Sequence, residues 1–233
     1  MAVTLSGLGG PGFAGSQMNI GMINLALLVL SFVCSMATAT AEERTTYLNA
    51  AADNNVSQLE WAIEQGIPVD SRDKRGRTAL LIATYHNAVD AARLLIGAGA
   101  DVNAKDDLQD SPYLYAGAEG KLEILKMTVA AGADLSSVNR YGGTALTPAA
   151  HHGHIEVVEY LLSTEVDIDQ VNYLGWTALL EAVILGDGGP TYQHIVELLI
   201  NAGADRSIRD REGRTALENA QEKGYSEITE LLQ

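Results

Sequence analysis

Short apolar segments alternate along the chain with polar, glycine-containing segments, and one apolar phrase returns at regular intervals. The phrase begins with Thr or Ser, continues with mostly apolar residues and ends at Ala, as in Thr177-Ala-Leu-Leu-Glu-Ala. Its six copies begin at Thr46, Thr78, Ser111, Thr144, Thr177 and Thr215, so the successive spacings are 32, 33, 33, 33 and 38 residues. A period this regular predicts one supersecondary unit that is copied and stacked, with function on an extended surface.

The segment from residue 73 to residue 104 shows what one unit contains. Asp73-Lys-Arg-Gly is typical of a turn, and Thr78 follows at the position of a helix N-cap before an apolar helix through Ala83. After a turn at Asn87, apolar residues at helical spacing predict a second helix: Val89, Ala92, Leu95 and Ile96. Gly99 is placed to end that helix as its C′ residue. Because one helix pair cannot bury its apolar face alone, neighbouring pairs must stack.

These features resemble the ankyrin repeat. The shared features are the 33-residue period, the Thr-x-Leu-x-x-Ala phrase, a Gly between the two helices, Leu-Leu pairs such as Leu161-Leu162, and Gly-Ala-Asp. The resemblance covers residues 42–233 and implies an all-α solenoid of six helix-turn-helix units with hairpin-like turns between them. The expected units are 42–72, 73–105, 106–138, 139–171, 172–209 and 210–233, and the first and last act as caps.

The chain departs from the family pattern in several places. The family's His after the helix start is replaced throughout, so the helices must rely more on packing; the replacing residues are Leu81, Leu114, Thr147 and Leu180. Pro148 removes an early backbone hydrogen bond from the fourth unit, and Glu165 stands where Gly is usual, which costs about 1 kcal/mol if the backbone there is left-handed. The insertion at residues 187–191 predicts a mobile surface loop. Leu161 and Leu198 are expected to fill the interfaces between helix pairs.

Residues 1–41 are expected to be an export signal that is separate from the fold. An apolar run from Ile23 to Val33 is followed by small residues, and Ala-x-Ala sites predict cleavage after Ala39 or Ala41. The run is shorter than the roughly 20 residues that a membrane-spanning helix needs. Met18 is a possible true start of the chain. The alternative is that residues 20–41 remain as an inner-membrane anchor.

Composition narrows the choice of compartment and partner. The net charge is −15, and all 30 acidic and all 15 basic residues lie after residue 41, which argues against nucleic acid or an anionic membrane surface as the main partner. The single cysteine, Cys34, lies within the predicted signal, so the mature chain is expected to contain no disulfide. We therefore expect a soluble monomer in the periplasm or otherwise exported, with a membrane association only if the N-terminal segment is retained.

The resemblance also implies where a partner binds. Ankyrin proteins usually bind through a concave face formed by the turn tips and the first helices. Carried over position by position, this face contains Tyr85, Leu108, Arg140, Tyr141, His151, His152, Tyr173, Leu174, Trp176, Ile184 and Leu185. We expect Tyr141, Tyr173 and Trp176 to form the central anchor, because exposed large rings are typical of binding hot spots. The alternative is that these rings pack sideways onto neighbouring units.

The chemistry of an enzyme is not evident in the sequence. The motifs of common nucleophiles, phosphate-binding loops and metalloproteases are absent, and we expect no cofactor. The adjacent His151 and His152 suggest a metal site only weakly, because neighbouring residues do not easily face one ion. The interpretation is a non-enzymatic protein-interaction scaffold; the alternatives are a membrane-tethered recruiter and an enzyme or metal-binding protein that uses the His151/His152 region.

Overall fold

The computed structural model describes residues 40–233, which form twelve helices in six consecutive pairs and contain no named strand. The helices are α2 (Ala41–Ala52), α3 (Val56–Glu64), α4 (Ala79–Tyr85), α5 (Val89–Gly97), α6 (Pro112–Ala118), α7 (Leu122–Ala130), α8 (Leu146–His151), α9 (Ile155–Leu162), α10 (Ala178–Leu185), α11 (Pro190–Asn201), α12 (Ala216–Lys223) and α13 (Ser226–Leu232). None of these helices is long and apolar enough to span a membrane. The predicted export signal lies outside the described residues except for Thr40 and Ala41.

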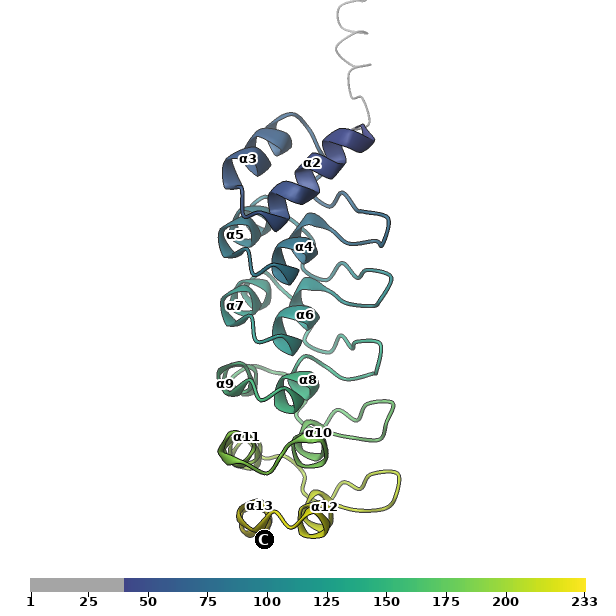
Figure 1. Cartoon of the computed structure of the whole chain (residues 1–233), viewed down its shortest axis with the longest axis vertical. Helices are drawn as coiled ribbons and strands as arrows, with labels where there is room; N and C mark the ends of the chain where they lie inside the picture. Colours follow the sequence, from purple (N-terminus) through teal and green to yellow (C-terminus); the bar gives the residue numbers. More distant parts are fainter. Residues whose placement is uncertain (1–39) are drawn as a thin grey trace, which may run out of the picture. The chain divides into compact units, whose positions relative to one another are not determined.

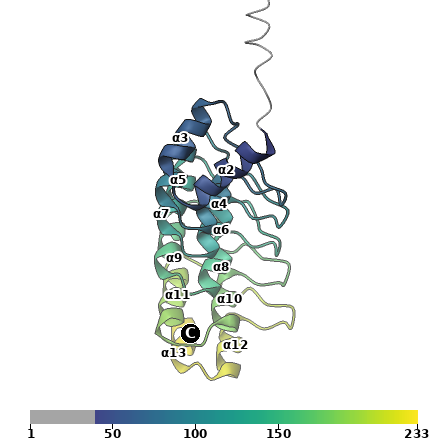
Figure 2. The same ribbon diagram turned by 45° about the horizontal axis from the view of Figure 1, so that its top comes forward.

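Residues 40–233 form a helical solenoid, as the sequence predicts. The first helices of the pairs stack in one row (α2, α4, α6, α8, α10, α12) and the second helices in another, while the hairpin loops between units project to one side beside the first helices (Figure 1, Figure 2). Each pair packs on the pairs before and after it, so the apolar core is continuous along the stack. We call the surface formed by the hairpins and the first helices the hairpin face.

The repeated Thr or Ser caps the first helix of most units. Its side-chain oxygen accepts a hydrogen bond from the backbone N–H three residues later in four units, where the capping residues are Thr78, Ser111, Thr177 and Thr215. The fourth unit differs because α8 begins only at Leu146, and the Thr144 hydroxyl is buried without a hydrogen-bond partner. Pro148 explains the later start, since it lacks the N–H that would bond the carbonyl of Thr144.

One Asp or Asn organises each hairpin loop. Its Oδ1 accepts hydrogen bonds from the backbone N–H groups two and four residues later, over 2.8–3.2 Å; the residues are Asp73, Asp106, Asn139, Asn172 and Asp210. The third residue after each has a positive φ, and it is Gly everywhere except at Gln109, whose φ is 65°. Neighbouring loops are joined by backbone hydrogen bonds such as Tyr173 N–H to Tyr141 O, 2.8 Å long. The hairpin face is therefore built on a regular, cross-linked backbone.

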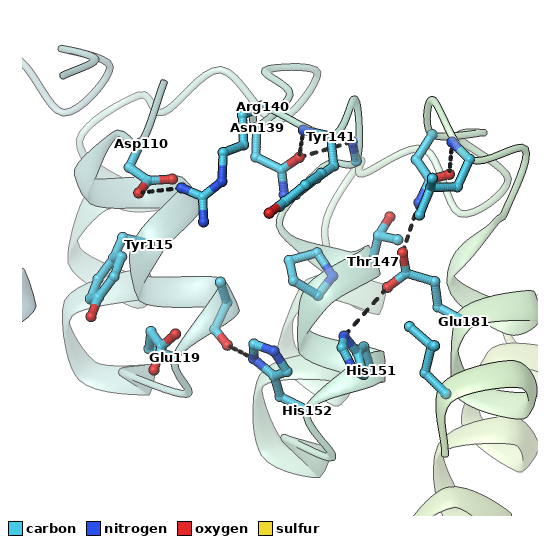
Figure 3. A pocket seen from close by; sticks show the side chains of 16 residues that line it. Asp110, Tyr115, Glu119, Asn139, Arg140, Tyr141, Thr147, His151, His152 and Glu181 are labelled. Atoms are coloured by element: carbon cyan, nitrogen blue, oxygen red, sulfur yellow. Dashed lines mark hydrogen bonds and ion pairs between the residues drawn. The ribbon is translucent and has the colours of Figure 1, made fainter. Parts of the chain in front are cut away.

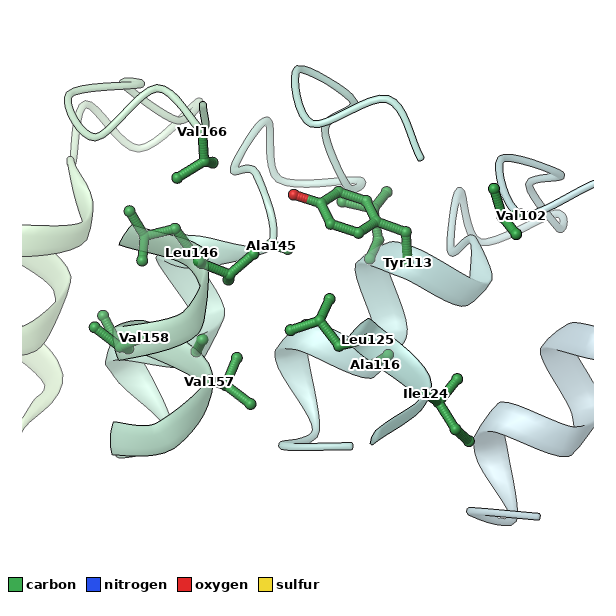
Figure 4. Close-up of a cluster of buried hydrophobic side chains, with 14 of the residues drawn as sticks. Val102, Tyr113, Ala116, Ile124, Leu125, Ala145, Leu146, Val157, Val158 and Val166 are labelled. Carbon is green, nitrogen blue, oxygen red and sulfur yellow. The ribbon is translucent and has the colours of Figure 1, made fainter. Parts of the chain in front are cut away.

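The core lies between the two rows of helices and along the stack (Figure 4). Leu161 is fully buried, as predicted, but Leu198 is only partly buried, and Leu199 is the fully buried residue of its pair. The prediction for Leu198 was wrong because the five-residue insertion shifts the fifth unit, so that Leu199 and not Leu198 is equivalent to Leu161. Tyr113 is also fully buried, with its hydroxyl lacking a partner.

The first unit departs from the repeat phrase at its start. Helix α2 begins at Ala41, so Thr46 lies inside the helix and not at its N-terminus. Thr40 is the N-cap instead, in a capping box: its Oγ1 accepts from Glu43 N–H (3.1 Å), and the Glu43 carboxylate accepts from Thr40 N–H (2.8 Å). The helix start thus depends on a residue that lies within the predicted signal.

The structure also shows the backbone at Glu165 and the contacts of the inserted loop in the fifth unit. Glu165 does not have a positive φ, so it carries no left-handed backbone penalty. The inserted loop after α10 is held by two tyrosines: Tyr225 OH donates to Gly186 O (2.9 Å), and Tyr192 OH donates to His151 O of the preceding unit (2.8 Å). The tyrosine ring of Tyr225 also packs where a side chain at Gly188 would lie.

Candidate functional site

An exposed apolar stripe runs along the hairpin tips of the third, fourth and fifth units. Leu108, Tyr141 and Leu174 occupy the same position of their hairpins, 33 residues apart, and their side chains are 55%, 54% and 44% exposed. The equivalent residues in the flanking units are charged, Arg75 before the stripe and Glu212 after it. The apolar surface is therefore confined to the three central units.

A groove of about 390 Å³ lies beside this stripe, on the same three units (Figure 3). Three residues that also recur at 33-residue intervals, on the first helices, line it: Tyr115 of α6, Pro148 of α8 and Glu181 of α10. The other lining residues are Asp110, Ala118, Glu119, Asn139, Arg140, Tyr141, Gly143, Thr147, His151, His152, Asn172, Leu174 and Leu185. The groove therefore spans three consecutive units of the array.

A charged and aromatic cluster forms the end of the groove toward the N-terminus. Arg140 Nη1 lies 3.4 Å from Asp110 Oδ2 and the guanidinium lies 5.0 Å from the Tyr141 ring centroid, so this cation is held between a carboxylate and an aromatic face. Burial raises the pKa of Asp110, and the nearby Arg140 opposes the rise. Tyr85 joins this cluster from α4, because its ring packs edge-on against Tyr115 with centroids 4.0 Å apart.

The opposite end of the groove contains Glu181, which is only 7% exposed. Its Oε1 accepts a hydrogen bond of 2.7 Å from Asn172 Nδ2, and its Oε2 lies 4.0 Å from His151 Nδ1, which is too far for a hydrogen bond (Figure 3). Burial raises the pKa of Glu181 to about 7, although the hydrogen bond from Asn172 opposes the shift. This end of the groove therefore presents a carboxyl group that is easily protonated.

Of the two adjacent histidines on the groove, His152 makes a contact with the preceding unit. His152 Nδ1 lies 2.6 Å from Ala118 O and links α8 to the preceding unit, while burial and the neighbouring His152 lower the pKa of His151. Among residues 40–233, no three His, Cys, Asp or Glu side chains are placed to hold a metal ion.

The structure brings most of the predicted site residues together. Six of them line the groove: Arg140, Tyr141, His151, His152, Leu174 and Leu185. Leu108 and Tyr173 lie exposed at the adjacent hairpin tips, and Tyr85 contacts the groove through Tyr115.

Trp176 and Ile184 do not stand exposed on this face. Both are partly buried and pack against the core, and the indole Nε1 of Trp176 is buried without a hydrogen-bond partner. The expectation of Trp176 as an exposed tip residue was therefore wrong, because its side chain is partly buried against the core. The reason is its place directly before the N-cap Thr177, where the hairpin returns to the helix.

The sequence interpretation missed Tyr115 and Glu181, which are central to the groove. A signal existed: the fifth residue of the repeat phrase is Ile82 in the second unit, then Tyr115, Pro148 and Glu181. The side chain at this repeated position changes from aliphatic Ile82 to the carboxyl group of Glu181, and the sixth unit has the amide Asn219 there.

The paired helices, Asx-organised hairpins and continuous core define residues 40–233 as an α-helical repeat array. The profile of the family described as "Ankyrin repeats (3 copies)" matches residues 17–106 and 113–210. The chain belongs to the ankyrin repeat family, and such arrays indicate a protein–protein interaction scaffold; they are typically not enzymes.

Two solved structures closely resemble the chain. An ankyrin repeat domain from Acinetobacter baumannii AYE is 54% identical, with a TM-score of 0.78 over 80% of this chain and 95% of that one. The ankyrin repeat protein EF0377 is 45% identical, with a TM-score of 0.78 over 80% of this chain and 96% of that one. The ankyrin repeat protein YahD of Escherichia coli (strain K12) is 49% identical over 53 residues, so the match spans only 26% of that protein and 23% of this chain.

Proposed function

We propose that the chain is a non-enzymatic scaffold that binds an extended segment of a partner protein across the hairpin face of units three to five. The observation that carries this proposal is the placement of exposed apolar residues. Of seven large apolar side chains exposed among residues 40–233, five lie on the hairpin face of these three units: Leu108, Tyr141, Tyr173, Leu174 and Leu185. Exposed apolar residues that cluster beside a groove are typical of an interaction surface.

The stripe and the groove suit different parts of one segment. Apolar side chains of the segment would cover Tyr141 and Leu174 at the tips, while its polar groups would meet the charged residues that line the groove. The net charge of −15 favours a protein segment over nucleic acid. We expect the scaffold to act as a monomer with one segment bound.

A peptide-display selection against residues 40–233 tests this proposal. We expect selected peptides to protect backbone amides of the third to fifth hairpins from hydrogen exchange. Protection confined to the second helices α7, α9 and α11, or to the end units, would contradict the proposed surface.

We also propose that the protein is exported and that its signal is cleaved after Ala39 in preference to Ala41. Cleavage after Ala39 leaves Thr40 as the first residue and keeps the capping box with Glu43, whereas cleavage after Ala41 removes the N-cap of α2. The intact mass of the mature protein tests this: a chain starting at Thr40 is expected. A chain that starts at Met1 or Met18 in the membrane fraction would support the retained anchor, and one that starts at Glu42 would contradict the site preference.

A further inference from the structure

Glu181 is a buried carboxyl group at a position where the fold does not need one. The preceding units hold Ile82, Tyr115 and Pro148 at the same place, and each forms a first helix. With 7% of its surface exposed, Glu181 has lost most of the water that would stabilise its charge. A carboxylate in such a place is unfavourable unless other groups donate hydrogen bonds to it or balance its charge.

Among residues 40–233, one hydrogen bond reaches this carboxylate. Asn172 Oδ1 already accepts from the backbone of Leu174 and Trp176 at 2.9 and 3.0 Å, so the amide orientation is fixed and Nδ2 must donate to Glu181 Oε1. Glu181 Oε2 receives no hydrogen bond from residues 40–233; its nearest basic group is His151, at 4.0 Å across the groove. Figure 3 shows this oxygen directed toward α8 and not into the core.

The sixth unit contains the same pair with the two groups exchanged, which allows a direct comparison. There the carboxylate is Asp210 in the hairpin and the amide is Asn219 on α12, with Asn219 Nδ2 donating to Asp210 Oδ2 over 2.8 Å. Two backbone N–H groups also donate hydrogen bonds to Asp210, and Arg214 lies close enough to form an ion pair with it. Burial acts to raise the pKa of Asp210, but these contacts hold it below the usual value. The sixth unit thus shows that a carboxylate in the hairpin and an amide on the helix are sufficient to hold the hairpin against the first helix. The exchanged order in the fifth unit places the carboxylate on the groove instead.

The charges that line the groove are also unbalanced. Asp110, Glu119 and Glu181 are acidic, and Arg140 is the one arginine or lysine among the groove-lining residues that the structure describes. Arg140 is engaged with Asp110 and the Tyr141 ring at the other end of the groove. The groove therefore lacks a cation at the end that holds Glu181.

We infer that the partner segment carries a basic side chain that enters the groove and donates hydrogen bonds to Glu181 Oε2, so that Glu181 selects which segments bind. This inference rests on the proposed function of the hairpin face. Arginine fits better than lysine, because its planar guanidinium can bond a carboxylate with two N–H groups. The acidic character of the whole chain would favour the approach of such a segment.

The test uses peptides selected by display on the wild-type protein. We expect them to share an Arg or Lys at one aligned position, and replacing it by neutral citrulline or norleucine should weaken binding about tenfold or more. In E181Q, which keeps the side-chain shape, the same replacement should have little effect. The matched control E159Q removes one exposed charge from α9 on the opposite row of helices. In this control, neutralising the basic residue of the peptide should weaken binding as much as it does in the wild type.

The results separate this inference from the proposed function. Peptides that bind the stripe but lack a shared basic position, or that lose the same affinity on neutralisation in E181Q as in the wild type, overturn the inference and leave the proposed function intact. If no peptide binds the hairpin face, the proposed function fails, and an NMR titration with N-acetyl-arginine amide still decides the role of Glu181. Saturable shifts of the Asn172 side-chain amide that are absent with N-acetyl-citrulline amide and in E181Q support it; their absence overturns it.

Discussion

At the scale of single residues, the position of a polar group decides whether it stabilises the fold or is available to bind a partner. Asp210 and Asn139 organise hairpins because their side-chain oxygens accept backbone hydrogen bonds. Glu181 has no such role, and its burial is unfavourable when it is ionised. This difference has a consequence for stability that can be measured without a partner.

Glu181 should make the protein less stable as the pH rises from about 4.5 to 7. Because its pKa is about 7 in the folded state and 4.5 when unperturbed, the folded protein retains a proton that the unfolded chain releases. The free energy of unfolding therefore falls between about pH 4.5 and 7, by roughly 3 kcal/mol at most. Urea unfolding of the wild type and E181Q at pH 5 and pH 8 tests this prediction.

E181Q should gain about 2 kcal/mol over the wild type between these two pH values. The lowered pKa of His151 acts in the opposite direction, but His151 is present in both proteins, so the comparison largely removes its effect. An unchanged difference between the two proteins at pH 5 and pH 8 would mean that the Glu181 carboxyl group titrates normally.

At the scale of elements, each first helix depends on how its start is capped. Thr177 accepts a hydrogen bond from Leu180 N–H, whereas the equivalent Thr144 hydroxyl is buried without a partner because Pro148 delays the start of α8. The same residue type in the same repeat position thus contributes differently to stability.

Replacing these two threonines by the similarly shaped valine should separate the two cases. Thr177→Val removes a cap and should cost about 1–2 kcal/mol, while Thr144→Val removes only an unpaired hydroxyl and should be neutral or stabilising. Chemical denaturation of both variants measures the difference. Equal losses would show that Thr144 caps its helix in solution.

At the scale of the whole molecule, stability is distributed along the stack, because each helix pair buries its apolar face only against its neighbours. Helix α11 contacts α9, α10 and α13, and its Leu199 is fully buried between them. Leu198, directly before it, is partly buried.

Leu199→Ala should therefore cost about 2–5 kcal/mol, close to the cost of Leu161→Ala, and Leu198→Ala should cost clearly less. Urea unfolding of the three variants provides the comparison. A larger loss of stability for Leu198→Ala than for Leu199→Ala would contradict this assignment, because it would mean that Leu198 lies on the buried face of α11.

The repeat made the fold predictable from sequence, since period, caps and helix pairs follow from the spacing of Thr, Leu and Gly. The positions of exposed Tyr141 and Leu174 were also predictable, because hairpin tips in a stacked array have no core to enter. Trp176 was not, because sequence does not show whether a ring beside an N-cap turns outward or inward. The role of Glu181 depends on contacts with Asn172 and His151, which come from packing and not from spacing.

The affinity of one selected peptide for Tyr141→Ala and Trp61→Ala tests the central claim most directly. The two rings are almost equally exposed, at 54% and 56%, but Tyr141 lies on the hairpin face and Trp61 on α3 of the other row. If the stripe binds the partner segment, Tyr141→Ala should weaken binding by about 2 kcal/mol and Trp61→Ala should leave it unchanged, with both variants folded. Unchanged affinity in Tyr141→Ala, or an equal loss in both variants, would contradict the proposed binding surface.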